Sequence, residues 1–596
     1  MANRSKKKQR QPKSESPGAV KSKEIPSTLP HRAVWPIVLP TLAIVAAILF
    51  IYGPVLHGGW LWDDDLYFAG NPLLREPDRI WKAWFEPGSF IDYYPILETV
   101  EWFQWQLWGM DTLGYHLTSL ALHLVSALLV WRLLSKFGLR LAWLGGLIFA
   151  VHPVQVESVA WIVELKNTLS LPPFLLALCA WIDYREHGKP RDYLLAVALF
   201  LFAMLCKITM APFPATILLY EWWKRGSLGG KLVLSSLPFC LISLLLGFTE
   251  VWVGQVYLQN NHGTPDPSPI GNVFSHLACA GSTLWFYFTQ YLLPIDVMPI
   301  YPHWTVDPPS PLQFVPWLLL GGVVAWSWTA RRRWGRHVLL GIGFFVLFLA
   351  PFLGFVAVSF MSFTWVMDHF LYLPIVGLIG LTVAGLDCLE MKLPSPLRPY
   401  AIGLVTALLA LLTYKSYRYA GMFLDSETLW TYELRQNPDA WPAYNILGNL
   451  QERQGQLPKA MDFYARALQI KPNYAEARYN LANVLREAGR LDEAAEQYRQ
   501  AFTLRPNHGK AHNNLGIILA QQSRFAEAAD QFRLALQTLP DNAEIHDNLG
   551  FCLERLGRST EALDEYRQAL RLDPNSTAAR TNLDHLQSVH TPTPSP

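Results

Sequence analysis

The sequence predicts an all-α protein with a polytopic membrane body of about eleven spans and a C-terminal α-solenoid. Two observations lead to this prediction. From about Trp35 to about Tyr414, apolar stretches alternate with short polar loops, and from Trp441 to Pro574 a helical-hairpin pattern recurs four times. Because the two parts of this 596-residue chain differ so sharply in composition, we expect at least two domains. The net charge of +2 gives no indication of a nucleic-acid partner.

The chain begins with a basic segment, residues 1–34, that is rich in Lys, Arg, Ser and Pro. We expect a disordered cytoplasmic tail, because the basic run is too long for a cleavable signal peptide and no small-residue cleavage site follows it. The six cysteines show neither a disulfide framework nor the spacing of a zinc site. The remaining predicted boundaries are a membrane domain at 35–416, a linker or degenerate half repeat at 417–440, four repeats at 441–574, a capping helix at 575–590 and a disordered tail at 591–596.

Loops rich in Lys and Arg mark the cytoplasmic side of a membrane protein. In this chain they follow alternate apolar stretches, whereas the stretch from Val251 to Leu312 contains neither residue. Residues Val273–Leu293 would break the alternation if they spanned the membrane, so we interpret them as a re-entrant or interfacial helix. The N-terminus is then predicted to lie inside and the repeats outside. Lys415 and Arg418 after the last span argue mildly against this sidedness, but long domains translocate largely regardless of such charges.

The hairpin pattern has a period of 34 residues, which is the period of tetratricopeptide (TPR) repeats. Its second helix carries small residues and an aromatic residue, and it ends at a proline. Small residues let the two helices approach, aromatic side chains fill the groove between them, and proline stops the second helix. The recurring aromatic residues are Tyr464, Tyr498, Phe532 and Tyr566, and the recurring prolines are Pro472, Pro506, Pro540 and Pro574.

Asparagine recurs at one position of the first helix, as Asn480, Asn514 and Asn548. That helix usually lines the concave face of the solenoid, where a ladder of amides can bond an extended peptide backbone in both directions. The alternative is that these amides tie adjacent helices together. The repeats therefore predict a protein or peptide partner, and both roles for the asparagines stay open.

The first predicted outside loop carries three adjacent carboxylates, Asp63, Asp64 and Asp65. Crowded like charges raise the pKa of at least one carboxyl, which suits a general base or a metal ligand. The alternative is a solvated acidic turn that caps a helix. Ionisable groups at the ends of other spans favour a functional site, because they would gather on the same membrane face. These groups are His152, Glu157, Glu164, Lys166, Lys207, Asp368 and His369.

Several short motifs are distributed over the membrane body. They are Trp62-Asp63-Asp64, Tyr94 to Leu97, Gly114 to Leu117, His152-Pro153 through Glu157, Lys166, Lys207, and Asp368 to Pro374. Combined with the repeats, they resemble the transmembrane and tetratricopeptide-repeat-containing O-mannosyltransferases and their bacterial relatives. Those proteins are GT-C glycosyltransferases that use a sugar carried on a polyprenyl phosphate. The resemblance covers nearly the whole chain after the tail and implies a multi-pass protein of the bacterial inner or plasma membrane.

The resemblance implies a GT-C-type body that transfers a sugar, mannose in the relatives, from a polyprenyl-phosphate donor to Ser or Thr hydroxyls. Asp63 or Asp64 would be the general base, with preference for Asp63, and Glu157 would orient a substrate or share a divalent cation with the aspartates. Direct displacement would invert the anomeric centre, and a need for metal is left open. The remaining implied residues are Lys166, Lys207 and His369 against the departing phosphate, and Asp65, His152, Asp368 and Tyr372 in support.

Three positions depart from the pattern of these relatives. Asn167 stands where they often have Asp, which removes one carboxylate. His369 stands where they often have Arg, which replaces a fixed charge by a titratable one. Ile208 replaces a glutamate that often follows the lysine. These differences leave the identity of the donor sugar open.

Three functions compete at this point. The first is a membrane glycosyltransferase that modifies protein hydroxyls. The second keeps the enzyme class, with a lipid or glycan acceptor and with repeats that recruit partners. The third is a non-catalytic membrane-anchored scaffold, which is disfavoured because an anchor needs one span and has no use for charged groups at span ends.

Overall fold

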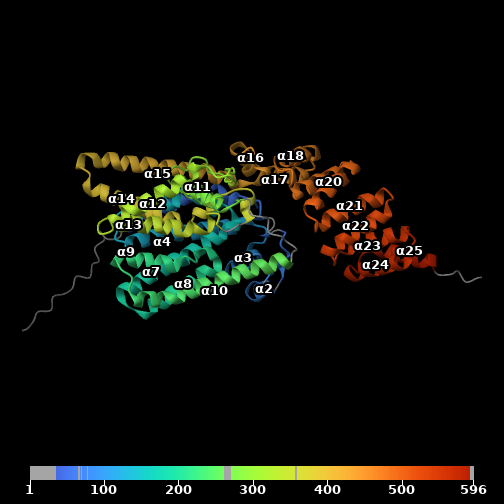
Figure 1. The fold of residues 1–596 in the computed structure, drawn as a ribbon, viewed down its shortest axis with the longest axis horizontal. Helices are drawn as coiled ribbons and strands as arrows, with labels where there is room; N and C mark the ends of the chain where they lie inside the picture. The colour runs from blue at the N-terminus through green and yellow to red at the C-terminus, as the bar shows by residue number, and fades with distance from the viewer. Residues whose placement is uncertain are drawn as a thin grey trace, which may run out of the picture.

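The computed structural model describes residues 35–590 except 65–66, 69, 77, 87, 261–269 and 356–358. Within these residues every regular element is a helix and no strand occurs. Figure 1 shows a body of helices that run side by side, with a curved array of short helices, α17 to α25, at one end. The predicted all-α class, with a membrane body followed by a TPR solenoid, is confirmed.

The body contains eleven helices that follow the predicted apolar stretches. They are α1 (Trp35–Tyr52), α4 (Thr112–Lys136), α5 (Ala142–Val151), α7 (Leu165–His187), α8 (Pro190–Cys206), α9 (Phe213–Arg225), α10 (Gly230–Asn260), α12 (Val315–Thr329), α13 (Gly335–Leu349), α14 (Ile375–Lys392) and α15 (Arg398–Ala420). In the described part of the chain, six helical stretches are long and apolar enough to cross a membrane. The count of about eleven spans stays a prediction.

The ambiguous apolar segment forms α11 (Val273–Leu292). At its first turn the hydroxyl of Ser275 donates to Asp307 Oδ1 at 3.2 Å, so the chain that follows α11 returns to the level at which the helix began. The indole of Trp317, in α12, then donates to the carbonyl of Leu277 at 2.9 Å. This return agrees with the re-entrant or interfacial interpretation. The sidedness of the protein stays a prediction.

The described part of the first loop contains two α-helices, α2 (Arg79–Phe85) and α3 (Pro95–Trp108). Helix α3 buries Glu98, Glu101 and Gln104 and exposes Phe103 and Leu107, which is the reverse of a helix that faces water. Its carboxylates face Arg79, which is 1% exposed and contacts Glu98 and Glu101. An exposed apolar face of this kind suits contact with lipid.

The solenoid consists of four helical hairpins and a closing helix. They are α17 (Trp441–Arg453), α18 (Leu457–Ile470), α19 (Ala475–Glu487), α20 (Leu491–Leu504), α21 (Gly509–Gln521), α22 (Phe525–Thr538), α23 (Ala543–Arg555), α24 (Ser559–Leu572) and α25 (Thr577–His590). An added Cβ at Gly448 would lie 2.5 Å from the ring of Tyr464, and one at Gly550 would lie 2.7 Å from Tyr566. The small residues therefore set the close approach of the paired helices, as the repeat pattern predicts.

The solenoid is mounted on the body by α16 (Ser426–Gln436), which follows the short turn Gly421–Leu424. One continuous hydrophobic core includes residues of α1, α5 and α14 and extends to Leu429 and Trp430 of α16 and to Leu447 of α17. The segment expected as a linker or half repeat at 417–440 is thus a packed helix between the two parts, and Figure 1 shows α16 beside the end of α15.

Candidate active site

Charged side chains from several segments meet at the end of the body nearest the solenoid. The segments are the loop after α1, the short helices α6 (Val156–Ala160) and Ile162–Glu164, the start of α7, the end of α8, and the turn Asp368–Leu371 before α14. Pro153 begins the first of these turns, and the residues between Val151 and Leu165 are almost wholly buried. The structure thereby brings Glu157, Glu164, Lys166, Lys207 and His369 into one cluster, as their position on one membrane face predicts.

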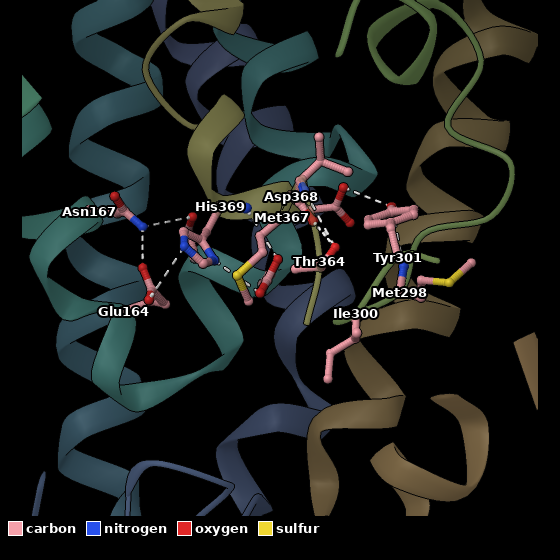
Figure 2. A network of polar contacts seen from close by, with 12 residues as sticks. Glu164, Asn167, Met298, Ile300, Tyr301, Thr364, Met367, Asp368 and His369 are labelled. Carbon is pink, nitrogen blue, oxygen red and sulfur yellow. Dashed lines mark hydrogen bonds and ion pairs between the residues drawn. The ribbon is translucent and has the colours of Figure 1, made fainter. Parts of the chain in front are cut away.

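His369 lies between two buried carboxylates, those of Glu157 and Glu164, and Figure 2 shows it beside Glu164. Its Nδ1 lies 3.0 Å from Glu157 Oε1, and its backbone N–H donates to Glu157 Oε2 at 3.2 Å. Its Nε2 lies 3.9 Å from Glu164 Oε1. Glu157 is fully buried, and its two contacts with His369 fix the orientation of the imidazole.

The two lysines are connected through Asn167. Lys166 Nζ lies 3.0 Å from Glu164 Oε1, and the Asn167 amide donates to the other oxygen of Glu164. Lys207 donates to Asn167 Oδ1 and is 6% exposed. An asparagine can donate to one partner and accept from the other, whereas an aspartate here would oppose Glu164. The missing carboxylate thus leaves Lys207 bonded to a neutral group.

The adjacent aspartates have different surroundings. Asp64 is fully buried and accepts from the backbone N–H of Leu61 and of Val163, both at 2.9 Å, which ties the first loop to the turn before α7. Burial raises the pKa of Asp63 to about 6, Lys166 lowers it and Glu164 raises it. The pKa of Asp63 is thus closer to neutral than that of an ordinary aspartate, whereas the Asp64 carboxylate is engaged in holding the loop. Asp65 lies outside the described residues.

Three of the predicted supporting residues, His152, Asp368 and Tyr372, are buried. Asp368 Oδ1 accepts from the hydroxyl of Tyr301 at 2.9 Å (Figure 2), and burial together with the nearby Glu157 raises the pKa of Asp368 well above its ordinary value. His152 Nε2 donates to the carbonyl of Tyr291 at 2.9 Å, which fastens the end of α11 to the loop. Tyr372 lies 3.0 Å from His123 Nδ1. Each of these three side chains therefore contacts a segment that is distant in the sequence.

A narrow pocket lies beside the cations. Lys207, His369 and Asn167 line one part of it, and Phe352, Phe370 and Leu373 line another. A small cationic head with apolar walls suits an anionic group that carries a hydrocarbon chain.

The carboxylates of the cluster do not form a cation cage. In the described ranges, one group of three side chains, Asp183, Glu186 and His187, brings its possible ligand atoms within 4.8 Å of one another. That group lies at the opposite end of α7, and Asp183 is paired there with Lys136 at 2.5 Å. We therefore derive no catalytic step through a divalent cation.

Parts of the chain match models of known protein families. The family model for dolichyl-phosphate-mannose-protein mannosyltransferases matches residues 95–252. Three tetratricopeptide-repeat models match residues 439–507, 479–543 and 543–576. Protein O-mannosyl-transferase Tmtc3 of Drosophila melanogaster is 24% identical over 530 residues, which cover 74% of this chain and 56% of that protein. The chain resembles the protein O-mannosyl-transferases.

Other relatives agree with this resemblance. Human protein O-mannosyl-transferase TMTC1 is 25% identical over 498 residues, again 74% of this chain and 56% of the relative. Drosophila melanogaster Tmtc1 is 31% identical over 201 residues, which cover 31% of this chain and 22% of that protein. The chain thus spans little more than half the length of the fly Tmtc3 and human proteins. The solved structure of YrrB, titled a TPR protein with an unusual peptide-binding site, is 23% identical, covers 27% of this chain and 82% of its own, and has a TM-score of 0.26.

The sequence analysis places Glu164 among the ionisable groups at span ends without giving it a role, and it does not single out Tyr301. Glu164 contacts Lys166 and His369 from opposite sides, and the signal for it was its position two residues before the lysine. Tyr301 holds Asp368 across 67 residues of chain, and no local pattern marks it.

Proposed function

We propose that the protein is an integral-membrane glycosyltransferase that transfers a sugar, mannose by analogy with its relatives, from a polyprenyl phosphate to Ser or Thr hydroxyls of proteins held by the repeats. The observation that carries the proposal is that Asp63, a half-buried carboxyl with a raised pKa, belongs to the same group of charges as Lys166 and Glu164, beside a pocket lined by Lys207 and His369. In this arrangement Asp63 would take the proton of the acceptor hydroxyl, and the pocket would receive the departing phosphate.

In the proposed reaction the acceptor hydroxyl oxygen bonds to the anomeric carbon while the bond from that carbon to the phosphate oxygen breaks. The electron pair of the broken bond remains on the phosphate, and the hydroxyl proton passes to Asp63. Attack opposite the leaving group inverts the anomeric centre. A base works best when its pKa lies near the operating pH, and the pKa of Asp63 at about 6 meets that condition.

The charges of the cluster favour a phosphate leaving group. Glu157 contacts His369, and Glu164 is paired with Lys166, so both carboxylates already have partners within the cluster. Lys207 contacts the neutral Asn167 and lines the pocket, so its charge remains available for an anion there. Cations in a site of low polarity stabilise the developing charge more strongly than they would in water.

The acceptor side of the proposal concerns Asn480, Asn514 and Asn548. The amide nitrogen of Asn480 donates to Asn445 at 3.1 Å and Asn449 at 3.0 Å, and that of Asn514 donates to Asn483 at 3.1 Å. These bonds link successive repeats, so the tying role exists alongside any contact with a peptide. If the ladder also binds peptide, Asn480→Ala will raise the KM of a peptide acceptor; if it only ties the helices, the variant will lower the Tm and leave KM unchanged.

The decisive test uses purified full-length protein in lipid nanodiscs with a polyprenyl-phosphate mannose donor and a Ser/Thr peptide. We expect Asp63→Asn to lower the transfer rate by about 10²- to 10⁴-fold at unchanged Tm, the usual contribution of a general base. The matched control is Asp78→Asn in the same loop, where the side chain is 55% exposed. An Asp63→Asn variant as active as the control would contradict the assigned base, and wild-type protein without transfer activity would favour the scaffold.

Removal of repeats separates a protein acceptor from a lipid or glycan acceptor. Because the body core includes Leu447 of α17, the truncation is best placed after Ile470, which keeps α16 to α18. A protein acceptor predicts that peptide modification collapses in the truncated protein. A lipid or glycan acceptor would still be modified.

A further inference from the structure

We propose that Trp430 of α16 is a positioning residue that holds Asp63 in its catalytic place through the neighbouring Trp62. The inference rests on the proposed function and adds to it a mechanical role for the helix that joins the repeats to the body. Its basis is a cluster of three indoles from three segments that are distant in the sequence: Trp62 in the first loop, Trp161 before α7, and Trp430 in α16.

Trp62 has a backbone conformation that needs external support. Its φ of 43° lies in the left-handed region, which a bulky L residue adopts only when its surroundings hold it there. Two other segments provide that hold. The ring of Trp161 stacks on Trp62 with centroids 5.2 Å apart and planes 3° apart, and the ring of Trp430 meets it edge-on at 4.9 Å.

The clamped residue lies directly before Asp63. On the other side of Asp63, the carboxylate of Asp64 accepts from the backbone of Leu61 and Val163. The backbone of Asp63 is thus fixed between an aromatic clamp on Trp62 and a hydrogen-bonded anchor at Asp64. Trp430 is fully buried in the body core, which makes it a firm wall for the clamp.

Helix α16 also contacts the opposite side of the site. Glu433 accepts from the backbone N–H of Ile300 at 3.3 Å, and Asn437 donates to the carbonyl of Ile300 at 2.9 Å. The next residue, Tyr301, donates to Asp368 (Figure 2). One helix at the start of the solenoid therefore supports both the loop of the proposed base and the turn that carries His369.

A purely structural role for Trp430 would reduce the amount of folded protein without changing the chemistry of what remains. If Trp430 is a positioning residue, its replacement by alanine should have three further effects. The kcat falls while the peptide KM stays within about twofold, because displacement of a catalytic group by about 1 Å can cost 10²-fold in rate. The acid limb of the pH profile moves to lower pH, because a loosened Asp63 becomes hydrated. The loss disappears when Asp63 is already replaced.

The experiment compares Trp430→Ala, Trp430→Phe and Trp441→Ala in the full-length protein. Trp441 is the matched control, an indole one helix further along that packs on Tyr474 and Lys471. We expect Trp430→Ala to lose about 10- to 100-fold in kcat, Trp430→Phe to recover most of it and Trp441→Ala to lose little. In the Asp63→Asn background, Trp430→Ala should cause no further loss. An equal loss in both backgrounds, or an unmoved acid limb, would overturn the proposal.

A second readout does not depend on activity. In a Cys388→Ser background, which removes an exposed thiol, the thiol introduced by Asp63→Cys is reacted with a water-soluble maleimide. We expect Trp430→Ala to speed this reaction at least tenfold and Trp441→Ala to leave it unchanged. Equal rates would refute the clamp even if the protein has no transferase activity. A faster reaction in a protein without transfer activity would support the clamp and contradict only the proposed function.

Discussion

The pH dependence of sugar transfer follows from the surroundings of Asp63. Burial raises the pKa of this carboxyl from an ordinary value of 3.8 to about 6. Since the base must be ionised to accept a proton, kcat/KM is expected to rise with pH and to reach half its plateau near pH 6. At pH 5 about a tenth of the molecules would have an ionised Asp63, whereas an ordinary aspartate would be more than about nine-tenths ionised.

Two neighbouring charged residues are expected to shift the midpoint of this pH dependence in opposite directions. Lys166 lowers the pKa of Asp63, so Lys166→Gln should move the midpoint of the acid limb to higher pH. Glu164 raises it, so Glu164→Gln should move the midpoint to lower pH. Both variants will also lower the plateau, because each removes part of the charged cluster. The position of the midpoint, and not the height of the plateau, therefore tests the reasoning.

The assay measures kcat/KM for peptide mannosylation from pH 4.5 to pH 8, since this parameter reports the free enzyme. Asp78→Asn serves as the control and should leave the midpoint where the wild type has it. A wild-type midpoint below pH 5 would refute the assigned environment of Asp63. Shifts of the same sign in the two charge variants would refute the assigned partners, and a preserved limb in the residual activity of Asp63→Asn would identify another group as the base.

Three further outcomes are expected. Asn167→Asp should raise the donor KM about tenfold, because a carboxylate would neutralise Lys207, and the peptide KM serves as the internal control. Tyr301→Phe should lower stability by about 1–2 kcal/mol in thermal unfolding, because Asp368 loses its buried donor; Tyr414→Phe on an exposed side chain is the comparison. Burial raises the pKa of Glu433 to about 8, so the folded state binds more protons and stability should fall as pH rises from about 4.5 to 8. Glu433→Gln should flatten that slope of Tm against pH, and an unchanged slope would contradict it.

The solenoid could be predicted almost completely, because its structure is local. The small residue, the aromatic ring and the proline act within one hairpin, and their spacing appears directly in the sequence. The close contact of Gly448 with Tyr464 is one consequence that the structure bears out. The span count could not be fixed in the same way, since helices such as α8 and α9 are short and are recognised by their place between neighbours.

The sequence predicts which charged groups belong to the site, but it does not predict how they are arranged in space. The resemblance favours Asp63 over Asp64, but the two residues by themselves do not reveal their different surroundings, because the partner of Asp64 is Val163, 99 residues further along the chain. Trp430 lies in a segment expected to be a linker or a half repeat. It contacts Trp62, from which it is separated in the sequence by almost the whole membrane body. Such contacts depend on how distant segments of the body pack together, and local sequence patterns do not reveal that packing.

The packing of α16 between the solenoid and the body limits how an acceptor can reach the base. A tethered solenoid would present a bound peptide at a range of distances, and its effective concentration at the site would depend on linker length. Here α16 shares a core with both parts, so the first repeat has a fixed orientation toward Asp63. Under the proposed function, only hydroxyls at a certain distance along a bound peptide would then reach the base. Selection among acceptor hydroxyls would follow from the packing around Trp430 as much as from the groove of the repeats.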